Sequence, residues 1–447
     1  MMGVINFIHE TSWKDLPEDV RRQARRCLLD TLGAGIAGSR TRLSQIVHDF
    51  AAAVFGGRDA HLWLDGREVS PPGAALANGM TIDSLDIHDG HPLAKGHAGA
   101  AIVPAVFAMI PLKHPKKITG AEMLTTVVIG YEIALRAGIA LHATACDYHT
   151  SGAWNALGSA AVAARRLKLS REKTRHALGI AEYHGPRSQM MRGIDYPTML
   201  KDGSGWGAMA GLSAACLAKE SFTGAPALTV EAEEVKGYWE DLGQNWLMIG
   251  QYFKPHAVCR WAQPAIEAAL MLQQTHRLTP DNIKQVEVHT FREAVRLNSR
   301  CPLSTEEAQY SLPFPLATAL VNGHLGLHEL NESALTDPIV LKLSGCIELI
   351  EDNRFSSRFP AQRFARVIIE TQDDNRHDSG EVEARWDSVD PPSDRELREK
   401  FRRLVQGALL ADRAEQLEEL IWRSSDLPDA ASLLDAMLKY DERDGRG

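Results

Sequence analysis

The densest group of side chains that could do chemistry lies in residues 83–97. These fifteen positions carry three His, three Asp and one Lys, and a strongly apolar run follows them at once. Histidine donates and accepts protons near pH 7, and a neighbouring aspartate can fix its tautomer and stabilise its cationic form. The small residues 98–100 would let an anion approach free N–H groups at a helix start. We therefore predict an acid–base loop in which Asp86 and His97 are catalytic and His91 binds substrate.

The same loop has two competing interpretations. A charged loop is often only a solvated surface segment. Asp86 and the three histidines are also plausible metal ligands, although their spacing matches neither HExxH nor a similar signature. We therefore expect neither a metal nor a cofactor here, and a metallohydrolase built on His88, His91 and His97 is the alternative.

Two further polar loops have the same arrangement. Tyr148 and His149 stand before the small-residue stretch 152–159, and Lys201 stands before the Gly-rich stretch 203–211. Adjacent side chains point in different directions, which leaves open whether Tyr148 or His149 faces a site. A cation beside the unpaired N–H groups of a helix start is a receptor for carboxylate or phosphate. We predict that all three residues are catalytic; the alternatives are a helix-capping loop and an exposed lysine without a role. The glycine pattern follows no predicted strand, so a dinucleotide site is not favoured.

A fourth segment, residues 253–261, adds two cations and a histidine just before the character of the chain changes. Lys254, His256 and Arg260 are its candidates for substrate binding, although an arginine beside an aromatic residue is as often structural. Together the four loops would line a closed pocket that suits a small polyanion. The sequence has no G-x-S-x-G elbow and no P-loop, so acyl transfer and ATP chemistry lack support.

The composition is that of an ordinary globular protein. The 447 residues include 44% hydrophobic and 24% charged residues. The net charge of −9 argues against nucleic-acid binding. The longest apolar stretch, 99–112, is too short to span a bilayer, and the N-terminus lacks the apolar core of a signal peptide. We therefore expect a cytoplasmic protein without a membrane segment, and six scattered cysteines without a CxxC pair predict reduced thiols.

Hydrophobic periodicity divides the chain into a helical region and a mixed region. Helical patterns occupy residues 15–40, 98–112, 120–146, 152–168, 171–184, 205–220, 264–276, 307–350, 395–411 and 427–439. Alternating patterns predict strands at 283–290, 364–371 and 381–386, with a hairpin loop between the last two, and Asp394 could cap the helix that follows it. We predict a mainly α fold. Its large all-helical domain is built from both chain ends, residues 1–262 and 393–447, and a smaller α+β lid domain is inserted at 263–392.

Six segments, in their order along the chain, resemble the MmgE/PrpD family. They are DLPEDVRRQARRCLLDTLGAGIAGS (15–39), ANGMTIDSLDIHDGHPLAKGHAGAAIVPA (77–105), HTSGAWNALGSAAVAARRLKL (149–169), LKDGSGWGAMAGLSAACLAKESFTGAP (200–226), FKPHAVCRW (253–261) and AQYSLPFPLATAL (308–320). The resemblance is thinner in the small domain and at the C-terminus. The family includes 2-methylcitrate dehydratase, cis-aconitate decarboxylase and iminodisuccinate epimerase.

The resemblance implies a metal-free active site between a helical domain and its lid, in a homodimer. By position it implies that Asp86, His97 and His149 are active-site residues, and that Lys201 and Lys254 are the active-site lysines. The chemistry shared by the family is removal of a proton or of CO2 next to a carboxylate, and preorganised cations lower such a barrier. We predict a lyase, either a dehydratase or a decarboxylase, that acts on a small di- or tricarboxylic acid. An epimerase of an iminodisuccinate-like acid is the runner-up, and a non-catalytic polyanion-binding protein is a further alternative.

Three features of the sequence depart from the patterns of the family. Decarboxylases of the family have a pattern similar to D-F-D-D-T where this chain reads Asp86-Ile-His88-Asp89-Gly90. They also carry a histidine at the position that corresponds to Cys259. The dehydratase pattern G-H-P-S-D is also absent. We therefore expect a substrate that differs from those of the two best-known activities.

Overall fold

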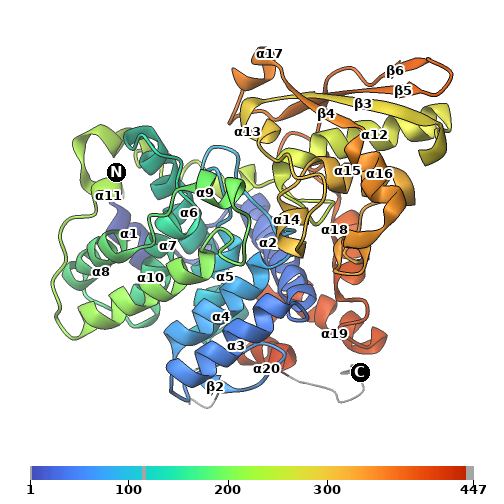
Figure 1. Ribbon diagram of the computed structural model, residues 1–447. Helices are drawn as coiled ribbons and strands as arrows, with labels where there is room; N and C mark the ends of the chain where they lie inside the picture. The colour runs from blue at the N-terminus through green and yellow to red at the C-terminus, as the bar shows by residue number, and fades with distance from the viewer. Residues whose placement is uncertain (1–2, 113–116, 439–447) are drawn as a thin grey trace.

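The computed structural model describes residues 3–112 and 117–438. Helices contain 58% of the residues and strands 9%, and a small mixed sheet lies in the C-terminal part. The segments coloured blue to green form a helical bundle, and the yellow and orange segments form a second part that contains the sheet (Figure 1). The red helices near the C-terminus return to the bundle (Figure 1). The predicted mainly helical fold is thus confirmed.

The bundle consists of helices joined by polar loops. Its helices are α1 (Val4–Glu10), α2 (Glu18–Gly38), α3 (Arg42–Val54), α4 (Pro71–Asp83), α5 (Gly99–Ala108), α6 (Gly120–Thr144), α7 (Gly152–Arg166), α8 (Arg171–His184), α9 (Met190–Asp195), α10 (Ser204–Lys219) and α11 (Leu228–Glu231). A short antiparallel ladder, β1 (Ala60–His61) with β2 (Glu68–Val69), interrupts them. The region predicted to be all-helical therefore contains two short strands that the sequence pattern did not indicate.

Small residues let α10 pack closely against α7. A Cβ at Gly211 of α10 would collide with the carbonyl oxygen of Ala156 in α7. The loops that precede these two helices are consequently held side by side, and the Gly152 N–H donates a hydrogen bond to the Asp202 carbonyl (3.0 Å). This packing brings together two of the polar loops that the sequence singled out.

We expect Gly211→Ala to lower the melting temperature, because the added methyl group would overlap the rigid backbone of Ala156. Overpacking of this kind typically costs about 1–3 kcal/mol. Differential scanning fluorimetry measures the loss. Gly237→Ala is the matched control, since a Cβ there would meet nothing within 4 Å. Equal melting temperatures for the two variants would contradict the packing argument.

Helix α6 is long and apolar enough to cross a bilayer, with a mean hydropathy of 1.5 in its most apolar window. Only the stretch 99–112 was assessed from the sequence as a possible membrane segment, and this longer helix was overlooked. In the fold, 94% of that window is buried inside the protein, where α6 packs against α2, α5 and α7. The core helices of globular proteins have these same properties, and the burial of α6 assigns it to that class.

The second part of the chain builds the sheet and the helices that cover it. Its elements are α12 (Gln263–His276), β3 (Ile283–Thr290), α13 (Arg292–Val295), α14 (Thr305–Gln309), α15 (Pro313–Asn322), α16 (Pro338–Gly345), β4 (Ile347–Glu351), α17 (Asn353–Ser356), β5 (Phe364–Thr371), β6 (Arg376–Asp378) and β7 (Val382–Glu383). The strand order is β4-β3-β5-β6, with β7 paired to β5. Strand β4 is parallel to β3, and the other pairs are antiparallel. Two predicted strands, 283–290 and 364–371, have the predicted bounds.

Two large hydrophobic cores organise the molecule. The first contains residues of the N-terminal helices together with Phe401 and Leu434 from the C-terminal helices α18 (Asp394–Val405) and α20 (Ala431–Leu438), and α19 (Ala411–Trp422) also contributes to it. The second contains residues of α12 to β5. The second core begins at Val258 but also takes in Met190 and Ile194 of α9, and Trp386 belongs to the first core. The predicted domain boundaries after residues 262 and 392 stay a prediction.

Other local predictions were wrong. The segment 307–350 was expected to be helical, but its end continues into β4, because a short apolar run has no periodicity that separates a strand from a buried helix. The expected hairpin loop contains β6, and only two residues of the predicted strand 381–386 form β7. The helix predicted at 395–411 ends at Val405. The last residue of the predicted helix 427–439 lies outside the described residues.

The cap of α18 is also not the predicted one. Ser393 accepts a hydrogen bond from the Glu396 N–H (3.3 Å), and the Glu396 carboxylate accepts one from the Ser393 N–H (2.7 Å). This reciprocal capping box leaves Asp394 inside the first turn, where it pairs with Arg22 (2.9 Å). The serine three residues before a glutamate was the signal that the sequence analysis missed.

Candidate active site

A cavity between the two cores receives residues from all four predicted loops. Protein atoms leave about 350 Å³ unfilled there, a volume that includes space open to solvent. The side chains around it are those of Asp86, Lys95, Gly96, His97, Tyr148, Met190, Asp202, Tyr252, Cys259, Arg260, Trp261, Tyr310 and Arg363. Four residues predicted for the site, Asp86, His97, Tyr148 and Arg260, therefore share one cavity.

Three residues at this site have a left-handed backbone although none is glycine. The φ angles are 49° at Asp86, 56° at Lys95 and 49° at Lys201. A non-glycine residue held in this region costs of the order of 1–3 kcal/mol and persists only where its surroundings fix it. Such outliers cluster at functional sites, which supports the assignment of this cavity.

A buried ion pair holds Asp86 in place. The ammonium of Lys254, which is completely buried, donates to Asp86 Oδ1 (2.5 Å) and to the Asp86 carbonyl (2.8 Å). Burial by itself would raise the pKa of the Asp86 carboxyl, but the Lys254 ammonium outweighs it and the pKa is lowered. Burial also opposes the charge of Lys254, and Asp86 reverses this, so that the pKa of the ammonium is raised. Both groups therefore remain charged at neutral pH.

His97 is held as a neutral imidazole with one nitrogen directed at the acid. Its Nδ1 donates to the Asp89 carbonyl (2.7 Å), which places the proton on Nδ1 and leaves a lone pair on Nε2. Nε2 lies 3.8 Å from Asp86 Oδ1. Burial, and then the nearby Lys254 ammonium, lower the pKa of His97 to about 4. His97 can therefore accept a proton at Nε2 throughout the neutral range.

His88 supports His97 from behind. The two rings stack with centroids 4.5 Å apart and planes 14° apart. Burial lowers the pKa of His88 to about 3, so its neutral ring donates from Nε2 to Asp83 Oδ1 (2.7 Å). Asp83 Oδ2 also accepts from the Ser204 N–H (3.1 Å) at the start of α10. The histidine pair is thus anchored to the helix that follows Lys201.

The ligand atoms of Asp86, His88 and His97 lie within 4.8 Å of one another, as in a metal site. These residues fit a metal ion poorly, however. The Lys254 ammonium already binds Asp86 Oδ1, and a metal ion on the same carboxylate would lie beside this positive charge. The bonds from one nitrogen of each ring to Asp83 or to the Asp89 carbonyl are common in metal sites, so the poor fit rests on the Lys254 ammonium alone.

We expect the purified protein to contain no stoichiometric metal and to keep its melting temperature in EDTA. A metal that binds the folded state stabilises it, so its removal would lower the melting temperature. Mass spectrometry of the metal content and thermal melts with and without chelator check this, with His88→Gln as the ligand-deficient control. A chelator-induced loss that Zn²⁺ restores in the wild type alone would contradict the expectation.

Lys201 links the bundle to the second part of the chain. Its buried ammonium donates to the side-chain oxygen of Gln309, which is the last residue of α14. The ammonium also lies 5.2 Å from the centre of the Tyr310 ring, which faces the cavity. Burial lowers the pKa of Lys201, although Asp86 and other acids oppose the shift. The predicted lysine is therefore next to the cavity, behind Tyr310.

The structure separates the neighbours Tyr148 and His149. Tyr148 faces the cavity, and its hydroxyl donates to the Lys95 carbonyl (3.0 Å). The N–H of His149 donates to His142 Nε2 (3.2 Å), and the two imidazole rings lie 6.5 Å apart. His149 is not one of the described residues that line the cavity. Its catalytic role stays a prediction.

The remaining predicted binding residues make their contacts with the protein itself. The ring nitrogens of His256 bond the Leu325 carbonyl (3.1 Å) and Glu267 (3.0 Å). His91 Nδ1 accepts from the Ala94 N–H (3.3 Å). Arg260 lines the cavity, but its guanidinium is engaged by the carbonyls of Phe253, Ala384 and Arg385 and by the Asp387 carboxylate. Their roles in substrate binding stay predictions.

Sequence reasoning missed several cavity residues. Tyr252 lies one residue before the segment 253–261, and Tyr310 lies within a segment quoted for the resemblance, so both were within reach. Arg363 precedes β5 in a stretch without a motif, and only the fold brings it to the cavity. The position of the two tyrosines beside cationic loops could have identified them from the sequence, whereas no sequence feature marks Arg363.

A second buried lysine, also missed, supports the acid–base loop from the other side. Lys400 of α18 donates to Asp30 Oδ1 (2.5 Å) and to the Ile87 carbonyl (2.7 Å). Burial raises the pKa of Asp30 and lowers that of Lys400 in spite of their contact. The residues Asp86 and Ile87 are therefore each tied down by a lysine that is distant in sequence.

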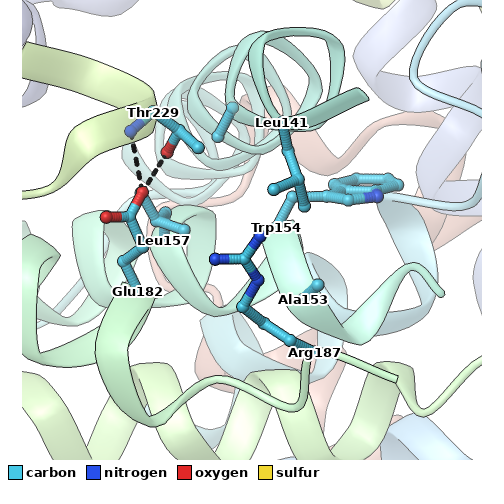
Figure 2. A pocket seen from close by; sticks show the side chains of 8 residues that line it. Leu141, Ala153, Trp154, Leu157, Glu182, Arg187 and Thr229 are labelled. Carbon is cyan, nitrogen blue, oxygen red and sulfur yellow. Dashed lines mark hydrogen bonds between the residues drawn. The ribbon is translucent and has the colours of Figure 1, made fainter. Parts of the chain in front are cut away.

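A separate small pocket lies between α7, α8 and α11 (Figure 2). Apolar side chains line it together with Glu182, Arg187 and Thr229. Glu182 accepts hydrogen bonds from the N–H (2.8 Å) and the hydroxyl (2.5 Å) of Thr229, as the dashed lines show (Figure 2). Its acid is thus used to cap α11, and none of the predicted site residues line this pocket.

Two family models match most of the chain. The MmgE/PrpD N-terminal domain matches residues 4–241, and the MmgE/PrpD C-terminal domain matches residues 256–426. The chain therefore belongs to the MmgE/PrpD family, as its sequence motifs predicted.

Several named enzymes are similar to this chain over most of its length. The chain is 27% identical to cis-aconitate decarboxylase of Homo sapiens, over 97% of this chain and 93% of that protein. It is 25% identical to a cis-aconitate decarboxylase-like protein of Aspergillus oryzae, over 96% and 95% of the two chains. It is 23% identical to the mitochondrial 2-methylcitrate dehydratase of Yarrowia lipolytica, over 83% and 76%. The distant homologues are thus lyases.

Proposed function

We propose that this protein is a lyase that acts next to a carboxylate of a small di- or tricarboxylic acid by acid–base chemistry without a metal. The observation that carries the proposal is the neutral His97, whose free Nε2 meets the buried Asp86–Lys254 pair at a cavity. The names of the relatives, which are decarboxylases and a dehydratase, support the reaction class.

The charges around the cavity suit a reaction that builds negative charge on a bound carboxylate. The Lys254 charge is balanced by Asp86, whereas Lys201 is bonded to a neutral amide and Lys95 lies over the Tyr148 ring (5.1 Å). Fixed cations in a desolvated site stabilise such charge strongly, because they need not reorganise during the reaction. Lys201 and Lys95 would hold the reacting carboxylate in this way.

The protons can be supplied and removed by groups at the cavity. In a dehydration, His97 Nε2 would take the proton from carbon, and hydroxide would leave with a proton from an acid. In a decarboxylation, CO2 would leave and the electron pair on carbon would be protonated. Tyr148 and Tyr310 are proton donors at the cavity: burial raises the pKa of both well above the ordinary value, which keeps the hydroxyls protonated and makes them weak acids.

An epimerase is the alternative, because it uses the same carbanion-like intermediate. It needs two acid–base groups on opposite faces of one carbon, and His97 with Tyr148 or Lys201 could supply such a pair. The homodimer and the cytoplasmic location implied at the sequence level also stay proposals.

The purified protein should be incubated with citrate-like, aconitate-like, tartrate-like and iminodisuccinate-like acids in D2O and followed by NMR. A lyase gives an alkene or CO2. An epimerase instead exchanges the α-proton and inverts the centre without other change. Binding of these acids without any conversion would contradict an enzymatic function and support a polyanion-binding protein.

We expect His97→Gln to reduce kcat by about 10²–10⁴, the usual contribution of a positioned acid–base group. The pH profile of the wild type gives a second test. Since burial lowers the pKa of His97 to about 4, the base stays neutral at pH 5–6, and kcat/KM should fall only as pH approaches 4. An acid limb centred at pH 6.5 would contradict this assignment. His324→Gln, an exposed histidine, is the control.

A further inference from the structure

We propose that Arg363 determines substrate specificity by binding a second carboxylate of the substrate, remote from the carbon that reacts. This inference rests on the proposed function and assigns the residue that would bind a second carboxylate. It follows from the position of the buried Arg363 guanidinium at the cavity and from the few hydrogen bonds that this group makes.

Among the described residues, no carboxylate is in direct contact with the buried guanidinium of Arg363, although Glu383 lies near enough to interact with its charge. Its residue is 4% exposed, and the guanidinium makes one long hydrogen bond, to the Pro92 carbonyl (3.4 Å). Its Nε is buried without a partner. Within residues 3–112 and 117–438, no carboxylate oxygen lies within 4.0 Å of it. A buried charge of this kind is costly unless an anion compensates it.

The neighbouring Arg260 shows what a structural arginine looks like at the same cavity. Its guanidinium donates to three carbonyls and pairs with Asp387 (2.9 Å). Both terminal nitrogens of Arg260 are bonded to the protein, and only its Nε is buried without a partner, as it is in Arg363. Arg363 lines the same cavity, but its donors are largely unused. The two arginines therefore have different functions, although both are buried.

Aromatic rings hold the Arg363 guanidinium in place without using its donors. Its central carbon lies 5.8 Å from the centre of the Tyr252 ring and 5.5 Å from that of Phe359. Contacts with ring faces position a guanidinium, while its N–H groups lie at the edge of its own plane. The planar fork of donors matches a carboxylate in two parallel hydrogen bonds.

The cavity thus has two distinct chemical regions. Asp86, His97 and Lys254 form the acid–base region on the helical bundle, whereas Arg363 comes from the segment before β5 in the second part. A substrate that spans both regions needs one carboxylate next to the reacting carbon and another for Arg363. A monocarboxylic acid could bind to only one of these two regions.

Isothermal titration with inert acids tests this without any turnover. Propane-1,2,3-tricarboxylate is the polycarboxylate probe, and butyrate is the monocarboxylate probe. We expect Arg363→Gln to weaken binding of the tricarboxylate by about 10- to 100-fold, because a charge-assisted pair is lost, and to leave butyrate binding within about twofold. Arg363→Lys, which keeps the charge but loses the fork, should lie between the two.

Arg366→Gln is the matched control, since Arg366 lies on β5 and pairs with Asp378 outside the cavity. Circular dichroism confirms that each variant is folded. Equal tricarboxylate affinity for the wild type and Arg363→Gln would overturn the inference, as would a wild type that binds neither probe. If a lyase substrate is found and its KM is unchanged in Arg363→Gln, the inference fails while the proposed function stands. If Arg363-dependent binding occurs but no acid is converted, the proposed function fails while the assignment of Arg363 stands.

Discussion

The site depends on the contact between the Lys254 ammonium and Asp86. This one group binds both the carboxylate and the carbonyl of the same residue, so it fixes side chain and backbone together. It thereby keeps Asp86 in its left-handed conformation and its Oδ1 3.8 Å from His97 Nε2. A buried pair of this kind contributes little net stability, but removal of one partner leaves the other charge uncompensated. The ion pair therefore serves mainly to position Asp86, and the geometry between Asp86 and His97 depends on it.

The loop that carries this geometry is held by two lysines that lie far beyond it in the sequence. Lys254 lies 168 residues after Asp86, and Lys400 lies 313 residues after Ile87, whose carbonyl it binds. The return of the chain to the bundle therefore does more than complete a hydrophobic core, because Lys400 of α18 binds the carbonyl of Ile87, the residue next to Asp86. Such long-range ties explain how a polar loop with a strained backbone can be buried and well defined.

Much of the fold could be predicted from periodicity, whereas the short elements could not. Strands β3 and β5 alternate apolar and polar residues over eight positions, and their bounds were predicted correctly. Strand β4 has five residues, and its existence depends on pairing with β3, which local sequence does not encode. The same limit applies at the site. Clustered polar loops identified Asp86, His97 and Tyr148, while Arg363 reaches the cavity only through the tertiary fold.

The side chain of Cys259 connects the sequence departures to the electrostatics of the cavity. Cys259 lines the cavity where the resemblance to decarboxylases would place a histidine, and burial raises the pKa of its thiol to about 12. It therefore supplies neither a proton carrier near pH 7 nor a positive charge. With Lys254 neutralised by Asp86, attraction for an anion must come from other cations around the cavity. Lys201 and Arg363 have no carboxylate partner among the described residues, and they flank the cavity from opposite parts of the fold. The positive charge around the cavity is consequently distributed differently from that in a site with a histidine at residue 259.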